Sequence, residues 1–223
     1  MAEGRSAMIR TVIFDWDGTL ARTLHLWIDG YHAAFARRDL AYGAHEIARH
    51  FFAEHHKVAY SHPHLDFPPI AEEARGHVFH GALTVALYDG AREVLAALHA
   101  RDVVLGLVSS SPRALLERGL EAQGLAGFFA SIIAGDDGFG HKPDPLPFEQ
   151  TLVRLGAAAA ETLIIGDSQV DILAGRAVGC RTCWFAPEDN RLFHDFAVVG
   201  AMMADHRIGD LGAVLDCVRP GGR

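Results

Sequence analysis

Short apolar runs alternate with longer segments of helical period along most of the chain. Continuous apolar runs of this length are typical of strands buried on both faces of a sheet. The alternation of strand and helix predicts an α/β fold with a mostly parallel sheet and right-handed crossovers. The runs expected to form strands are Thr11–Phe14, Val103–Val108, Ser131–Ile133, Thr162–Ile165 and Thr182–Phe185.

The alternation is interrupted between the first and the second expected strand. Residues 23–88 show no convincing strand pattern, and helical spacing relates the large apolar side chains Leu24, Trp27, Ile28, Tyr31 and Phe35. We therefore expect a helical insertion. It would divide the chain into a discontinuous core domain, residues 1–22 and 89–223, and a helical domain of residues 23–88.

Composition and charge exclude several classes of protein. The formal net charge of −8 argues against a partner such as nucleic acid, whose phosphates attract basic proteins. No apolar run approaches the ~18 residues of a membrane span. The first residues lack the apolar core of a secretory signal, and three cysteines do not suggest a disulfide framework. We expect a cytoplasmic protein with neither a nucleic acid nor a membrane partner.

Acidic side chains follow two of the expected strands. Asp15 and Asp17 come directly after the first strand, and Asp167 and Asp171 come after the fourth. In open parallel sheets, ligands bind beyond the carboxyl ends of the strands. Neighbouring carboxylates are unfavourable unless a cation neutralises them or one of them holds a proton. The pattern favours a divalent metal such as Mg²⁺, which prefers oxygen ligands.

Groups suited to binding an anion follow the second and the third expected strands. Ser109, Ser110 and Ser111 precede a helix start marked by Pro112, and a helix start offers unpaired backbone N–H groups. Lys142, one of only two lysines in the chain, follows the Ser131–Ile133 strand. The four strand ends together fit a phosphate group and a divalent metal.

These segments resemble the four motifs of the haloacid dehalogenase superfamily, in the subgroup of phosphoglycolate phosphatases and β-phosphoglucomutases. The first motif matches Asp15 to Leu20, the hydroxyl of the second matches Ser109, the lysine of the third matches Lys142, and the fourth matches Gly166 to Asp171. The resemblance implies a Rossmann-like three-layer α/β/α sandwich, with a helical cap inserted after the first motif.

The resemblance also implies a reaction. A Mg²⁺-dependent phosphatase of this kind would hydrolyse a small phosphorylated metabolite, such as phosphoglycolate or a sugar phosphate monoester. The reaction would pass through an aspartyl-phosphate on Asp15. Asp17 would act as general acid and base. The implied metal ligands are Asp15, Asp17 through its backbone carbonyl, Asp167 and Asp171. Ser109 and Lys142 would stabilise the phosphate during transfer.

Further residues are candidates for substrate binding. Trp16 lies between the two acids of the first motif, and Ser110 follows Ser109. Arg22 stands where the family usually has an acid, and either contacts an anionic substrate or lies on the hinge surface. In the cap, the candidates are His55, His56 and Lys57. Ten of the fourteen histidines fall between His25 and His80, but without the spacing of a familiar zinc site.

Three alternative functions stay open at this point. A β-phosphoglucomutase-like phosphotransferase would use the same residues. A phosphonoacetaldehyde hydrolase-like enzyme would form a Schiff base on Lys57, although that relative has alanine where this chain has Asp17. A non-catalytic binding protein is disfavoured, because all four motif residues Asp15, Asp17, Lys142 and Asp167 are present. We expect the protein to be either a monomer or a homodimer.

Overall fold

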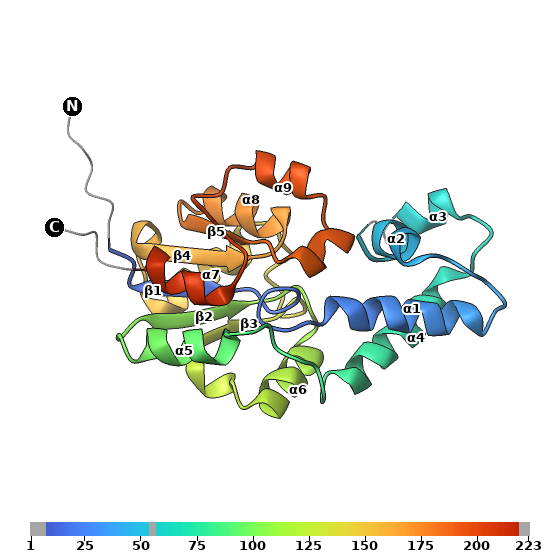
Figure 1. The fold of residues 1–223 in the computed structure, drawn as a ribbon, viewed down its shortest axis with the longest axis horizontal. Helices are drawn as coiled ribbons and strands as arrows, with labels where there is room; N and C mark the ends of the chain where they lie inside the picture. The colour runs from blue at the N-terminus through green and yellow to red at the C-terminus, as the bar shows by residue number, and fades with distance from the viewer. Residues whose placement is uncertain (1–7, 54–56, 219–223) are drawn as a thin grey trace.

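The computed structural model describes residues 8–53 and 57–218, and its strands form one parallel sheet (Figure 1). The strand order is β3-β2-β1-β4-β5-β6. The chain builds outward from β1 on one side and then crosses to the other side at β4, so the ligand crevice of such a sheet is expected between β1 and β4. The strands are β1 (Thr11–Phe14), β2 (Val104–Val108), β3 (Ser131–Ile133), β4 (Thr162–Gly166), β5 (Arg181–Phe185) and β6 (His206–Ile208).

The sheet has one strand more than the sequence pattern indicates. The five expected strands agree with the structure to within one residue at each end. The additional strand, β6, is three residues long, lies at the sheet edge beside β5, and buries only Ile208. A strand with one buried residue shows neither an apolar run nor a clear alternation, so patterning did not reveal it.

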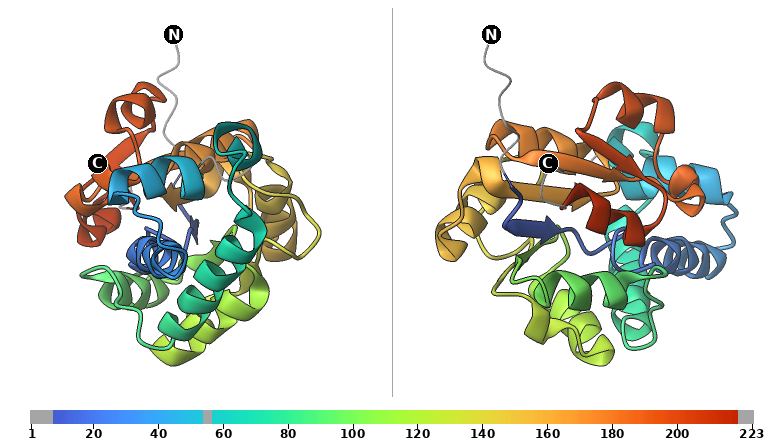
Figure 2. Two further views of the ribbon diagram at one scale, coloured as in Figure 1. Left: turned by 90° about the vertical axis from the view of Figure 1, so that its right-hand side faces the viewer. Right: turned by 60° about the vertical axis from the view of Figure 1, so that its left-hand side comes forward.

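Helices cover both faces of the sheet, as the predicted three-layer sandwich requires (Figures 1 and 2). Val12 and Phe14 of β1 pack with α5 and α6 on one face, whereas Ile13 packs with α7 and α8 on the other. Successive side chains of a strand point to opposite faces, which explains why β1 is apolar throughout. The helices of this layer structure are α5 (Ala91–His99), α6 (Arg113–Gln123), α7 (Leu146–Leu155), α8 (Gln169–Ala177), α9 (Phe196–Ala201) and α10 (Val214–Cys217).

A helical insertion connects β1 to α5 and extends beyond one end of the sheet (Figure 1). The two chain segments that join it to the sheet run side by side, because Arg22 N donates to Ala86 O and Tyr88 N donates to Leu20 O, both at 2.9 Å. The described part of the insertion contains α1 (Leu24–Ala36), α2 (Ala44–Glu46), a π-helical segment (Ile47–Ala53), α3 (Val58–Ser61) and α4 (Phe67–Gly81).

The insertion has an apolar core of its own. The stripe predicted from Leu24 to Phe35 lies on α1, where Leu24, Ile28, Tyr31 and Phe35 are buried. These side chains pack with the π-helical segment and α4, and with Phe193, which comes from the segment after β5. None of the helices in the described ranges combines the length and hydropathy needed to cross a membrane.

Gly30 allows α1 and α4 to approach closely. A Cβ at this position would lie 2.9 Å from the backbone oxygen of Ala74 and 3.1 Å from its Cα. Both are backbone atoms of the facing helix, so a larger residue could be accommodated only by moving one helix away from the other.

We predict opposite effects for alanine at two helical glycines. Gly30→Ala should lower the free energy of unfolding by up to about 2 kcal/mol, because overpacking against the Ala74 backbone costs roughly 1–3 kcal/mol and outweighs the roughly 1 kcal/mol gain in helix propensity. The control is Gly76→Ala in α4, whose added Cβ meets nothing within 4 Å, and which should be stabilising by up to about 1 kcal/mol. Denaturant unfolding measures both values, and equal effects would contradict the packing argument.

Candidate active site

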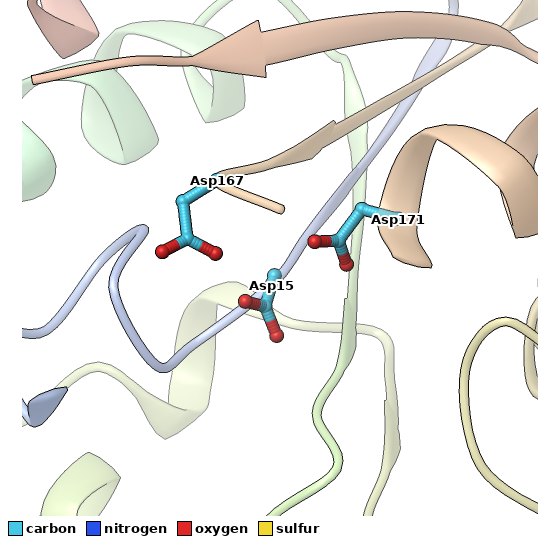
Figure 3. Close-up of side chains that lie close together, drawn as sticks. All are labelled: Asp15, Asp167 and Asp171. Atoms are coloured by element: carbon cyan, nitrogen blue, oxygen red, sulfur yellow. The ribbon is translucent and has the colours of Figure 1, made fainter. Parts of the chain in front are cut away.

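Three aspartates meet at the carboxyl edge of the sheet. Asp15 follows β1, Asp167 follows the neighbouring strand β4, and Asp171 lies in the first turn of α8. All three are buried, and one carboxylate oxygen of each lies within 4.8 Å of the others. Figure 3 shows their carboxylates turned toward a common space. In the chain as described, residues 8–53 and 57–218, no other group of three His, Cys, Asp or Glu side chains comes as close together.

Lys142 lies among these acids and forms two buried ion pairs. Its Nζ is 2.7 Å from Asp15 Oδ1 and 2.6 Å from Asp171 Oδ1, and its side chain is 4% exposed. Burial alone would lower the pKa of Lys142, but the two carboxylates outweigh burial and raise the pKa above its usual value. Lys142 is therefore charged, and it links the ends of β1 and α8.

The carboxylates outnumber the lysine, which shifts their protonation. Burial raises the pKa of Asp15 well above the usual value; Lys142 opposes this, and the nearby carboxylates of Asp171, Asp167 and Asp17 add to it. Burial also raises the pKa of Asp167. The site thus gathers more carboxylates than Lys142 can pair with, and its oxygen donors match those that Mg²⁺ prefers.

Asp17 is surrounded by hydroxyl groups. Its Oδ1 accepts from Thr23 Oγ1 at 2.6 Å, and its Oδ2 accepts from Ser109 Oγ at 2.9 Å and from Ser111 Oγ at 2.8 Å. Ser109 Oγ in turn accepts from the backbone N–H of Ser111 at 2.9 Å. The hydroxyl cluster after β2 thus orients the second acid of the first motif.

Gly18 occupies a position that only glycine fits. Its φ is +77°, and a Cβ there would lie 2.1 Å from Asp167 Oδ2. The glycine of the Asp-x-Asp-Gly motif therefore lets Asp167 come close to the loop that carries Asp15 and Asp17.

Two functional residues that the sequence analysis missed hold Asp167. Asn190 Nδ2 donates to Asp167 Oδ2 at 2.9 Å and to Gly18 O at 2.8 Å, and His194 Nε2 lies 2.8 Å from the same Asp167 oxygen. The hydroxyl of Tyr88 donates to Asn190 Oδ1. Asn190 and His194 both follow β5, so the one sequence signal for them was their position after the carboxyl end of a strand.

A cavity of about 330 Å³ opens above the acids. Asp15, Asp17, Lys142 and Asp167 line its base, and Ser110 and residues 168–170 line one side. Leu24 and Phe52 from the insertion, with Phe193 and His194, complete the lining. The site thus lies between the sheet edge and the helical insertion.

The other predicted binding residues are placed differently. The Trp16 side chain is 1% exposed and packs in the core beside α6, so only its backbone is available to a ligand. Arg22 pairs with Asp189 and lies over the Tyr88 ring, 4.4 Å from its centroid, where the two connecting segments join the insertion to the sheet. Lys57 is exposed and does not line the cavity. His55 and His56 lie outside the described residues.

Comparison with known proteins agrees with this geometry. The family model described as "Haloacid dehalogenase-like hydrolase" matches residues 12–185. A pyrophosphatase PpaX of Halalkalibacterium halodurans is 34% identical over 188 residues, which cover 78% of this chain and 82% of the relative. A phosphoglycolate phosphatase of Rhodospirillum rubrum is 31% identical over 234 residues, covering 96% of this chain and 94% of the relative.

Solved structures share the fold. A haloacid dehalogenase family hydrolase from Deinococcus radiodurans, crystallised with bound phosphate and sodium, superposes with a TM-score of 0.79 at 23% identity, over 95% of this chain and 97% of that one. The match to the family model spans the sheet from β1 to β5 and includes all four strand-end motifs. The chain therefore belongs to the haloacid dehalogenase-like hydrolases.

Proposed function

We propose that this phosphatase of the haloacid dehalogenase-like family hydrolyses a small phosphate monoester with Mg²⁺, through an aspartyl-phosphate on Asp15. The observation that carries the proposal is the buried cluster of Asp15, Asp167 and Asp171, paired with Lys142 at the switch point of the sheet. Relatives named as a pyrophosphatase and as a phosphoglycolate phosphatase support a small phosphorylated substrate.

Asp15 is the proposed nucleophile. Lys142 donates to Oδ1 of Asp15 and fixes the orientation of its carboxylate. The other oxygen, Oδ2, would attack phosphorus and displace the alcohol, and water would then hydrolyse the aspartyl-phosphate. Lys142 supplies positive charge beside the transferring group, where the transition state is most negative.

Asp17 is the proposed general acid and base. Hydrogen bonds from Thr23, Ser109 and Ser111 hold its carboxylate beside the Asp15 loop. From there it would give a proton to the leaving alkoxide and later take one from the attacking water. When substrate binds, Ser109 would turn its hydroxyl from Asp17 to a phosphate oxygen, with Ser110 at the cavity rim as a further donor.

Asp15, Asp167, Asp171 and the backbone carbonyl of Asp17 are the proposed ligands of Mg²⁺. The buried excess of carboxylates over lysine fits a divalent cation. When bound, the ion supplies charge neutralisation that allows an anionic nucleophile to meet a phosphate. Asn190 and His194 would keep Asp167 oriented for this task.

The helical insertion is the proposed cap over the site, with residues 23–88 as the cap domain and residues 1–22 and 89–223 as the core domain. Leu24 and Phe52 reach from it into the cavity above Asp15. Such a cover excludes bulk water from the phosphoryl intermediate. We expect the enzyme to act in the cytoplasm on a free small molecule, as a monomer or a homodimer.

Replacement of the nucleophile tests the chemistry. Asp15→Asn should reduce Mg²⁺-dependent hydrolysis of an aryl phosphate by at least about 10³-fold, the scale of loss when a covalent nucleophile is removed. Lys57→Ala is the control for Schiff-base chemistry and should keep the activity of the unaltered enzyme. Steady-state phosphate release measures both. Persisting activity in Asp15→Asn, or borohydride trapping of a substrate on Lys57, would refute the proposal.

The pH dependence of metal binding gives a test without turnover. Burial raises the folded-state pKa of Asp15 and Asp167 above the unfolded value of ~4. In the metal-free protein, the contribution of these two carboxyl groups to folding stability is therefore fully present below pH ~4. That contribution is lost as the pH rises through the folded-state pKa. Mg²⁺ binds the ionised carboxylates, so its stabilisation should increase over that same rise.

We expect saturating Mg²⁺ to raise the melting temperature by roughly 5 °C near pH 7.5, and by less near pH 5. Differential scanning fluorimetry measures the shift, with Asp167→Asn as the control that should abolish it. A shift of the same size in Asp167→Asn, or one that decreases with pH, would show that Mg²⁺ binds elsewhere.

A further inference from the structure

Part of the cavity lining is apolar and aromatic. Leu24 begins α1, Phe52 lies in the π-helical segment, and Phe193 follows β5. The rings of Phe52 and Phe193 meet edge to face, with centroids 6.0 Å apart at 74°. Phe193 is 7% exposed and belongs to the apolar core of the insertion. This wall, defined by Leu24, Phe52 and Phe193, therefore combines two residues of the insertion with one from the segment after β5, all packed in the same apolar cluster.

The cationic groups of the cavity are already paired. Of the described residues that line it, Lys142 and His194 are the two able to carry positive charge. Lys142 donates to Asp15 and Asp171, and His194 lies against Asp167. Apart from the acids Asp15, Asp17 and Asp167, the other polar side chains of the lining are neutral, namely Ser110, Ser168 and Gln169.

This distribution of charge discriminates between leaving groups. A leaving group with a second anion, such as a carboxylate or another phosphate, would lose water against the apolar wall, and the lining residues that the structure describes offer it no unpaired cation in return. An aromatic or aliphatic group would instead bury its own surface against Leu24, Phe52 and Phe193. The wall thus favours esters of apolar alcohols.

We propose that the wall of Leu24, Phe52 and Phe193 is the leaving-group subsite, and that the enzyme prefers phosphate monoesters of alcohols bearing an aromatic or bulky apolar group. This inference rests on the proposed phosphatase function. Phe193 and Phe52 are its specificity-determining residues. The preference differs from what the names of two relatives, a pyrophosphatase and a phosphoglycolate phosphatase, indicate, which is a substrate with two anionic groups.

Three esters of primary alcohols test the preference with similar leaving-group chemistry. They are 2-phenylethyl phosphate, propyl phosphate and the phosphate ester of 3-hydroxypropanoate, which carries a terminal carboxylate. We expect kcat/KM for the phenylethyl ester to exceed that of each of the others by about tenfold or more, the scale of discrimination in an apolar pocket. Initial rates of phosphate release with Mg²⁺ give the three values.

Variants locate the source of the preference. Phe193→Ala and Phe52→Ala should each lower the phenylethyl-to-propyl ratio of kcat/KM by at least about threefold. The ratio is insensitive to a general loss of activity, and Phe52→Ala serves if Phe193→Ala does not fold. The matched control is Phe79→Ala, an aromatic residue of α4 that packs under Arg118 and does not line the cavity, and it should leave the ratio unchanged.

The outcomes separate this inference from the proposed function. Hydrolysis of all three esters with the carboxylate ester equal or best would overturn the subsite while leaving the phosphatase intact. An unchanged ratio in both Phe variants, or an equal fall in Phe79→Ala, would overturn the role of the wall. Absence of phosphate release from every ester and from an aryl phosphate would refute the phosphatase itself.

Discussion

Mutual repulsion among buried carboxylates is the constraint on which this end of the sheet depends. Asp15, Asp167 and Asp171 lie within 4.8 Å of one another, at a separation where like charges in a protein interior repel strongly. The surrounding residues offset that repulsion. Lys142 pairs with Asp15 and Asp171, and Ser168 donates hydrogen bonds to Asp171 Oδ2 from both its N–H and its hydroxyl. The same excess of charge that opposes folding prepares the site to bind a divalent cation and a phosphate.

The segment from Asn190 to His194 connects the acids to the helical insertion. Asn190 joins the Asp15 loop, Asp167 and Tyr88, while Phe193, three residues later, packs into the apolar core of the insertion. One short segment therefore supports a proposed metal ligand and forms part of the cavity wall.

Local patterns in the sequence predicted most of the fold and the acidic cluster. Five strands and the helix stripe from Leu24 to Phe35 follow from periodicity, and topology alone brings the ends of β1 and β4 together. Contacts between distant segments were not predictable. Asn190 and His194 reach Asp167 across more than twenty residues, and Trp16 adjoins Asp15 and Asp17 yet points into the core. Arg22 likewise pairs with Asp189, a partner that no local pattern reveals.

In the proposed mechanism, Asp15 becomes covalently phosphorylated. The most direct measurement is peptide mass spectrometry of enzyme quenched in acid during turnover of an aryl phosphate with Mg²⁺, conditions under which an acyl phosphate survives. We expect a phosphoryl group on the peptide containing Asp15, absent when Mg²⁺ is withheld and absent in Asp15→Asn. A phosphoryl group on another residue, or none during demonstrated turnover, would contradict it.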